Sequence, residues 1–245
     1  MKKNKYRINK RGKITLYSFI LLVILSIYIC ISSSIFELKE IKLSGNEKLS
    51  KKDIIATSNL KLGGNLFQYN IEDIEKSISN NAYIKDVKVK RKMPDKLEIN
   101  IIENKEDAIV KLGKNNIYIQ NDGLILSEST KIINENIPII TGIKLEKNKV
   151  KEHIDIIGET KQNLLILMLQ CLGNNNMNRE IETININKND VKMKTNDDIN
   201  IDIKLDDNVD YNIKKLRQIL VDLKSNNIKN GNVDLTSKEQ AIYSP

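Results

Sequence analysis

The feature that most limits what this chain can fold into is an uncharged stretch that runs from Ile14 to Phe36. As a helix, the eighteen residues from Ile14 to Ile31 would be ~27 Å long, close to the ~30 Å hydrocarbon core of a bilayer. Twelve of them are Ile, Leu, Val or Phe, and their transfer favours insertion by roughly 4–7 kcal/mol. The stretch therefore predicts one membrane-spanning helix, placed at residues 14–35.

The basic residues of the chain are concentrated before this helix. The 245 residues carry 40 Lys and Arg against 32 Asp and Glu, and seven of the basic ones lie within residues 1–13, which contain no acid. The positive-inside rule places such a segment in the cytoplasm and everything after Phe36 outside the cell membrane. Because the rest of the chain is nearly neutral, and has three Phe and no Trp for base stacking, nucleic acid is not an expected partner.

A cleaved signal peptide is the alternative interpretation of the same stretch, with Ser32 to Ser34 as the small-residue cleavage site. The apolar run is longer than the usual ~7–15 residues of a signal peptide, and no A-x-A pattern ends it. A retained anchor is therefore the favoured interpretation. Since Cys30 lies in the spanning stretch and Cys171 far beyond it, we expect no disulfide inside the outer part of the chain.

The residues after the helix begin with a strand-like pattern and a tight turn. Apolar side chains at 36, 38, 41 and 43 predict a short strand with an irregularity near Lys39. Ser44-Gly45-Asn46 is expected to form the turn, because Gly and Asn adopt positive φ at low cost. A helix should follow, with Ser50 as its cap and Asp53 three residues later in a capping-box arrangement.

A second helix and a hairpin complete this first domain. Asn70 is expected to cap the helix, whose Ile71, Ile74 and Ile78 fall on one face. Alternating strands over 87–91 and 97–101 then flank the turn at Met93 to Lys96. The resulting order is strand, helix, helix, strand, strand, and both helices must cover one face of a three-stranded sheet to bury their apolar stripes.

Three sequence motifs mark this domain: "SGN" after the first strand, "GGNLF" between the helices, and "VKVKRKMPDKLEINIIE" as the closing hairpin. Together with the order of elements, they resemble the POTRA domain of the FtsQ/DivIB division proteins. The motif residues, expected to have structural roles, are Gly45, Asn46, Gly63, Asn65, Phe67, Pro94, Asp95 and Glu103. The resemblance implies a basic tail at 1–13, a membrane helix at 14–35, a POTRA domain at 36–106 and a β-rich FtsQ/DivIB-type domain at 107–245.

The second domain is predicted to be an antiparallel sheet with flanking helices, so the expected fold class of the chain is α+β. A hairpin is predicted around Asn121-Asp122-Gly123, and a helix over 164–172 is expected to stop at Gly173. Three alternating segments between 184 and 205 predict an antiparallel meander, followed by an amphipathic helix over 213–223. Val233-Asp234-Leu235 is expected to be the final strand.

Residues able to carry catalysis are scarce. His153 is the only histidine, in a stretch rich in Lys and Glu, and Cys171 falls on the apolar stripe of its helix, where a thiol behaves as a small hydrophobe. Gly63-Gly64 lacks the Gly-Lys-Ser/Thr ending of a phosphate-binding loop. We therefore predict no catalytic residue, no metal and no cofactor.

The resemblance implies a non-catalytic scaffold at the division septum that recruits small single-pass proteins of the FtsB/DivIC and FtsL kind and couples them to septal wall synthesis. Exposed strand edges could bind such partners by β-augmentation. Wall polymer is a further possible contact. The expected partner-binding residues are Val233, Asp234, Leu235 and Tyr243. Two alternatives stay open, a membrane-anchored cell-wall enzyme and a POTRA-type export or receptor component.

Overall fold

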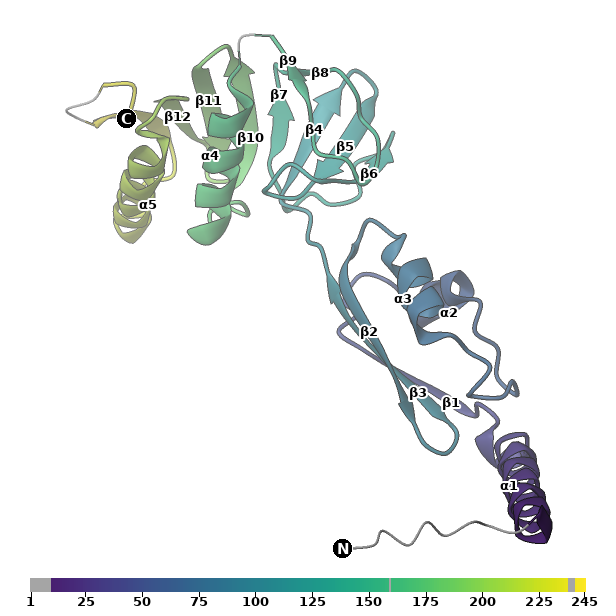
Figure 1. The fold of residues 1–245 in the computed structure, drawn as a ribbon. Helices are drawn as coiled ribbons and strands as arrows, with labels where there is room; N and C mark the ends of the chain where they lie inside the picture. The colour runs from purple at the N-terminus through teal and green to yellow at the C-terminus, as the bar shows by residue number, and fades with distance from the viewer. Residues whose placement is uncertain (1–9, 159, 238–240) are drawn as a thin grey trace, which may run out of the picture. The chain divides into compact units, whose positions relative to one another are not determined.

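The structure, a computed structural model, describes residues 10–158, 160–237 and 241–245 (Figure 1). The chain forms two compact units, one ending at Glu103 and one beginning at Asn104. Helices and sheets occur in both units, and the predicted α+β class is confirmed.

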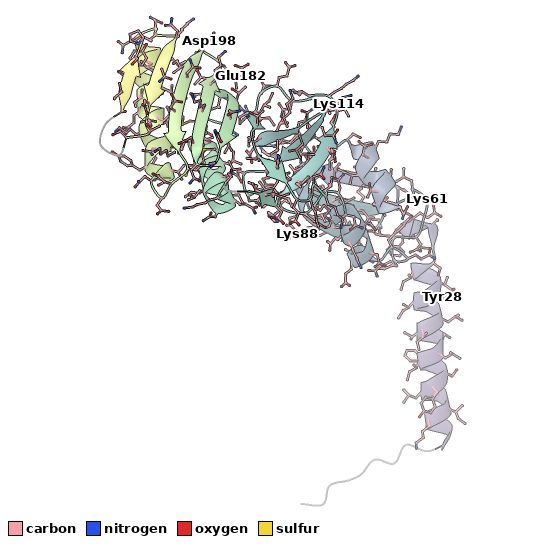
Figure 2. The ribbon with its side chains drawn as sticks, turned by 90° about the horizontal axis from the view of Figure 1, so that it is seen from above. Tyr28, Lys61, Lys88, Lys114, Glu182 and Asp198 are labelled. Carbon is pink, nitrogen blue, oxygen red and sulfur yellow. The ribbon has the colours of Figure 1, made fainter. Side chains whose placement is uncertain are left out.

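The first unit begins with α1 (Lys10–Ile31), followed by the short 3₁₀ helix η1 (Ser34–Phe36). The window Gly12–Ile29 is long and apolar enough to cross a membrane, and none of it is buried against the described protein. Its side chains extend outward all around the helix, as Tyr28 does in Figure 2. The uncharged stretch predicted a helix over residues 14–35, and the helix observed there ends at Ile31.

A βααββ domain follows, in the predicted order. Its elements are β1 (Glu40–Ser44), α2 (Lys51–Ser58), α3 (Ile71–Ser79), β2 (Ile84–Lys92) and β3 (Lys96–Glu103). The sheet order is β1-β3-β2, with β3 parallel to β1 and antiparallel to β2. Both helices lie over one face of this sheet (Figure 1).

Both predicted helix caps are present. The backbone N–H of Asp53 donates to the Ser50 hydroxyl at the start of α2, and that of Glu72 donates to the Asn70 side chain at the start of α3. Each bond satisfies one of the N–H groups that a helix leaves unpaired at its first turn.

The irregularity predicted near Lys39 is a change of pairing partner. Before it, the Leu38 N–H donates to the Gly64 carbonyl and the Leu66 N–H to the Phe36 carbonyl, both at 2.8 Å. After it, residues 40–44 pair with β3. The core beneath is apolar and almost fully buried, and includes Leu38, Ile54, Leu66, Ile74, Ile78, Leu97 and Ile99.

The second unit is built on one nine-stranded sheet of order β14-β13-β12-β11-β10-β7-β4-β5-β6. Its strands are β4 (Ala108–Leu112), β5 (Asn115–Ile119), β6 (Ile125–Ser129), β7 (Ile139–Thr141), β10 (Ile181–Asn187), β11 (Asp190–Thr195), β12 (Ile199–Lys204), β13 (Gly231–Asp234) and β14 (Ile242–Ser244). A two-stranded ribbon, β8 (Lys144–Leu145) with β9 (Ile156–Ile157), and two helices, α4 (Gln162–Asn174) and α5 (Val209–Ser225), complete it.

This sheet contains both parallel and antiparallel strand pairs, whereas an antiparallel sheet was expected. The predicted meander β10-β11-β12 is antiparallel, but β7 runs parallel to both β4 and β10, and β12 parallel to β13. Parallel neighbours need a long crossover connection. The connection from β7 to β10 contains α4, and the one from β12 to β13 is α5.

Other expectations for this unit also need correction. The strands over 108–112 and 139–141 were not predicted. Val233-Asp234-Leu235 was expected to be the final strand, but β14 follows it. The helix α4 also continues through Gly173 to Asn174, with Asn175 as its C-cap. The first left-handed residue after it is Asn176, at φ +56°.

The core of the second unit lies between its sheet and the two helices, which cover one face (Figure 1). Leu165, Met168 and Leu172 from α4, and Ile213 and Leu216 from α5, are fully buried there. A smaller cluster on Ile109, Tyr118 and Ile137 forms separately from this core.

Candidate partner-binding site

Gly45 and Asn46 hold the turn that leads from β1 into α2. Gly45 has φ +82°, and a Cβ at this position would collide with the carbonyl oxygen of Ile101 on β3. The side-chain amide of Asn46 donates a 3.1 Å hydrogen bond to the Leu49 carbonyl. Only glycine fits so close to a neighbouring strand, which accounts for the tight return of the chain over its own sheet.

Glu103 closes the same loop from the far end of β3. One carboxylate oxygen accepts from the Lys48 N–H at 2.7 Å and the other from the Leu49 N–H at 3.0 Å. The side chain therefore pairs two backbone donors just ahead of α2, across 54 residues of sequence. These two contacts give Glu103 a structural role in the loop.

Gly63, Asn65 and Phe67 form the connection between α2 and α3. Gly63 has φ +85°, and the Asn65 side-chain oxygen accepts from the Phe67 N–H at 2.9 Å. The Asn65 amide nitrogen donates at 2.7 Å to the carbonyl of Ile31, the last residue of α1. The Phe67 ring meets Phe36 edge to face, with centroids 5.1 Å apart.

Pro94 and Asp95 lie in the turn between β2 and β3. The Asp95 carbonyl accepts from the Lys39 N–H at 2.8 Å, and its carboxylate lies 3.6 Å from the Lys39 ammonium. The turn is thereby attached to the segment that precedes β1. All eight motif residues lie within the βααββ domain, and the contacts described for them are contacts within the first unit.

The predicted partner-binding residues come together at one edge of the nine-stranded sheet, on β13, on β14 and, for Leu235, directly after β13. Val233 pairs with Tyr243, and Asp234 with Ile242, in the antiparallel pair β13-β14. Val233 and Leu235 are buried in the core, so their side chains pack rather than face solvent. The outermost strand is β14, and its Ile242 is 54% exposed.

Local contacts occupy the polar groups of Asp234 and Tyr243. The Asp234 carboxylate accepts from both the N–H and the hydroxyl of Thr236, and these hydrogen bonds lower the pKa of Asp234. The Tyr243 hydroxyl donates at 2.8 Å to the Asn230 carbonyl, and its ring lies where a side chain on Gly231 would be. The edge that these residues form is therefore well defined.

An open groove of about 740 Å³ runs beside this edge. Ile219 and Leu223 of α5, together with Val233 and Tyr243, give it an apolar lining. Ile228 and Ala241 add to this apolar lining, and Lys215, Gln218 and Asp222 supply its polar side chains. A strand edge next to an apolar groove can bind an extended peptide through its main chain and one of its side chains at the same time.

The other strand edges of the two sheets carry contacts with neighbouring parts of the protein. In the βααββ domain, the Lys51 ammonium binds the Ile41 carbonyl of β1, and the Glu75 carboxylate accepts from the Val89 N–H of β2. At β6, Ile125 exchanges hydrogen bonds with Lys151 and Glu152. Such contacts protect an edge from pairing with another chain. No described strand pairs with the outer side of β14.

Neither candidate for catalysis lies in an arrangement suited to it. The Cys171 Sγ donates to the Asp210 carboxylate at 3.1 Å, and burial, reinforced by this carboxylate, raises the pKa of Cys171 to about 11. A thiol with such a pKa is protonated near neutral pH and is a poor nucleophile. His153 is exposed, and its Nε2 lies 3.9 Å from the Asp122 Oδ2. Among the described residues, no group of three His, Cys, Asp or Glu could hold a metal ion.

Two residues at strand edges were missed from the sequence. Ile242 is the exposed apolar residue of β14, and its only sequence signal was the apolar run Ala241-Ile242-Tyr243 so soon after the preceding strand. Glu75, which protects β2, has no sequence signal, because an acid on an amphipathic helix is ordinary.

Comparisons with known proteins agree on one family. Residues 36–104 match the model of the FtsQ-type POTRA domain. The chain is 28% identical over 203 residues to the cell division protein DivIB of Clostridium tetani, covering 82% of this chain and 76% of that protein. It is 30% identical over 141 residues to DivIB of Clostridium botulinum, where the alignment covers 58% of this chain and only about half, 55%, of the relative.

A solved structure, the major extracytoplasmic domain of DivIB from Geobacillus stearothermophilus, matches 51% of this chain and 97% of its own, at 13% identity and a TM-score of 0.36. The sequence matches are what carry the comparison. The resemblance inferred from the SGN, GGNLF and hairpin motifs is confirmed, because residues 36–104 match the FtsQ-type POTRA domain and the chain is similar to the DivIB cell-division proteins.

Proposed function

We propose that this protein is a non-catalytic, membrane-anchored scaffold of the bacterial division machinery. In this role α1 spans the cell membrane with the basic N-terminal segment in the cytoplasm, and the POTRA domain and the second domain project outward at the division septum. The names of similar proteins support the role in division. The one long apolar helix among the described residues, with basic residues ahead of it, supports the placement in the membrane.

The partners proposed are small single-pass proteins of the FtsB/DivIC and FtsL kind, and their recruitment is coupled to septal wall synthesis. Anchoring in the same membrane confines scaffold and partner to two dimensions, which raises their effective concentration toward each other. A direct contact with wall polymer is compatible with this role and is not needed for it.

The observation that carries the proposal is the outer edge at β14. An extended partner segment adds to β14 through main-chain hydrogen bonds and places an apolar side chain in the groove between α5 and the strands. Ile242 contacts the partner, whereas Val233 and Leu235 support the edge from inside. Lys215 and Asp222 place one positive and one negative charge beside the groove, and these charges can fix the register of the partner segment along β14.

Crosslinking in living cells tests this contact. A photoreactive residue at position 242 should capture a small single-pass division protein, whereas one at Val221 should not. Val221 is 59% exposed, close to Ile242 in exposure, and lies on α5 but outside the groove. Equal capture from both positions, or none from 242, would refute β14 as the contact.

The matched charge variants separate binding from folding. Ile242→Glu should abolish capture and give filamentous cells with stalled septa, because it places a charge at the proposed contact. Val221→Glu should leave capture and division unchanged. Both side chains are exposed, so neither change should unfold the domain. Depletion of the whole protein should also produce filaments. Normal division after depletion would remove the proposed role itself.

A further inference from the structure

Some apolar side chains of the connection between α2 and α3 face the core, and others face solvent. Leu60 and Leu66 are buried in the POTRA core, whereas Leu62 and Phe67 are 63% and 39% exposed. The backbone between them is held in place: the Tyr69 hydroxyl donates to the Lys61 carbonyl at 2.6 Å, and a side chain on Gly64 would collide with that hydroxyl. The exposure of Leu62 is therefore a consequence of a defined loop.

The same connection is attached to the end of α1. The Asn65 amide donates to the Ile31 carbonyl, one of the C-terminal helix carbonyls that have no partner within the helix. Four residues further on, η1 carries Ile35, which is 58% exposed, and then Phe36, which contacts Phe67. Figure 2 shows Lys61 on the side of the domain next to this end of α1.

We propose that Ile35, Leu62 and Phe67 form a lipid-contacting rim by which the POTRA domain rests on the outer surface of the membrane. This inference rests on the placement of α1 in a membrane, which is part of the proposed function. The rim starts within four residues of the last residue of α1, so it is continuous with the surface that the helix already presents to lipid.

The chemistry of the rim fits the boundary between acyl chains and headgroups. Isolated apolar and aromatic side chains enter that boundary, while an adjacent ammonium group remains in the polar headgroup region. Lys61 precedes Leu62 and is exposed, as this arrangement requires. Asn65 is the positioning residue, because its bond to Ile31 joins the loop to the helix and so fixes the side of the domain that meets the lipid.

Tryptophan scanning of the full-length protein in vesicles tests the rim, since the natural chain contains no Trp. The variants are Leu62→Trp, Phe67→Trp, Leu22→Trp within α1 as the bilayer reference, and Ile102→Trp as the matched control. Ile102 is 56% exposed. It lies six residues beyond Lys96 along β3, about 20 Å from the hairpin turn that contacts Lys39.

The vesicles contain phosphatidylcholine and phosphatidylglycerol, with bromine-labelled acyl chains as the quencher. Emission should fall at positions 62, 67 and 22 and stay unchanged at 102. Quenching at 22 without quenching at 62 would overturn the rim and leave the anchor intact. If Leu22→Trp is not quenched, both the membrane placement of α1 and the rim are contradicted. Leu62→Trp decides the matter even if Phe67→Trp fails to fold, because Leu62 is outside the core.

The role of Asn65 is tested in the Leu62→Trp background. Asn65→Ala should reduce the quenching at position 62, because the domain is no longer held to the end of α1. Gln68→Ala, an exposed residue of the same segment, is the control and should leave quenching unchanged. If Asn65→Ala also leaves it unchanged, Asn65 does not position the rim.

Discussion

The carboxylate of Glu75 on α3 accepts a 2.7 Å hydrogen bond from the backbone N–H of Val89 on the edge strand β2. A charged acceptor to a partly buried backbone donor contributes about 1.5–3 kcal/mol to stability. We expect Glu75→Ala to lower the free energy of unfolding by about this amount and to promote self-association, because an edge amide loses its partner.

Urea unfolding and analytical ultracentrifugation check this prediction, with Lys76→Ala as the control. Lys76 is the next residue on α3 and is exposed, so its loss should change the free energy of unfolding by less than about 0.5 kcal/mol. Equal stability of the two variants would contradict the role given to Glu75.

Gly45 and Gly63 offer a matched pair of substitutions in one domain. Their φ values are +82° and +85°, but a side chain at Gly45 meets the Ile101 carbonyl oxygen while one at Gly63 meets nothing within 4 Å. Gly63→Ala should therefore cost about 1–2 kcal/mol for the left-handed backbone alone. Gly45→Ala should cost about 1–3 kcal/mol more, because the loop must also move away from β3.

Chemical denaturation of both alanine variants measures this difference directly. If the two variants are equally stable, close packing of the SGN turn against β3 is not what requires glycine there.

Glu103 accepts hydrogen bonds from two backbone donors, Lys48 and Leu49. Glu103→Gln retains one carbonyl oxygen but places an NH₂ group against the second donor, so the free energy of unfolding should fall by about 1–3 kcal/mol. Glu98→Gln, on the same strand and partly exposed in a pair with Lys92 at 3.3 Å, is the control and should have a smaller effect. A larger loss for Glu98→Gln than for Glu103→Gln would contradict this prediction.

The raised pKa of Cys171 predicts a loss of stability in alkaline solution. Its pKa is 9.0 when unperturbed and about 11 in the folded protein, so folding favours the protonated thiol. That contribution is fully present below pH 9 and is lost as the pH rises from 9 through 11.

The comparison with Cys171→Ala isolates this contribution, because the other alkaline groups titrate in both proteins. The difference in free energy of unfolding between the two proteins should be constant below pH 9 and should shift in favour of Cys171→Ala between pH 9 and 11. Parallel pH profiles across that range would show that the thiol is not perturbed by folding.

The parts of the fold that the sequence predicted well are those specified by local chemistry. Ser50 and Asn70 cap the helices where expected, and the spacing of Ile71, Ile74 and Ile78 gives one buried face. Turns at Gly45 and Pro94 follow from residue types with restricted or unusual backbone preferences. Such signals are contained within a few residues and do not depend on the rest of the molecule.

The mixed pairing of the second sheet could not be predicted from local sequence patterns. Alternation predicts a strand but does not say which neighbour it joins or in which direction, and β7 has only three residues. The crossover rule could nevertheless have been applied to α5, because a helix between two strands of one sheet favours parallel pairing. Applying it would have predicted the pairing of β12 with β13.

The partner-binding role of the candidate site stays a prediction. Val233 and Asp234 were expected on the final strand, but a further strand, β14, lies outside them and has only three residues, too few to give a periodic signal. Exposure of Ile242 follows from its place on the outermost strand, which only the assembled sheet reveals.

The short length of β14 has a practical consequence for anyone labelling this protein. The strand has three residues and ends at Ser244, so a fluorescent protein or affinity tag joined close behind it would lie beside its backbone. Such a bulky addition would shield the main-chain groups to which the proposed partner segment binds, and a reporter placed there would then mimic a loss-of-function allele. Imaging and pull-down reagents should therefore be attached at a surface site away from β14.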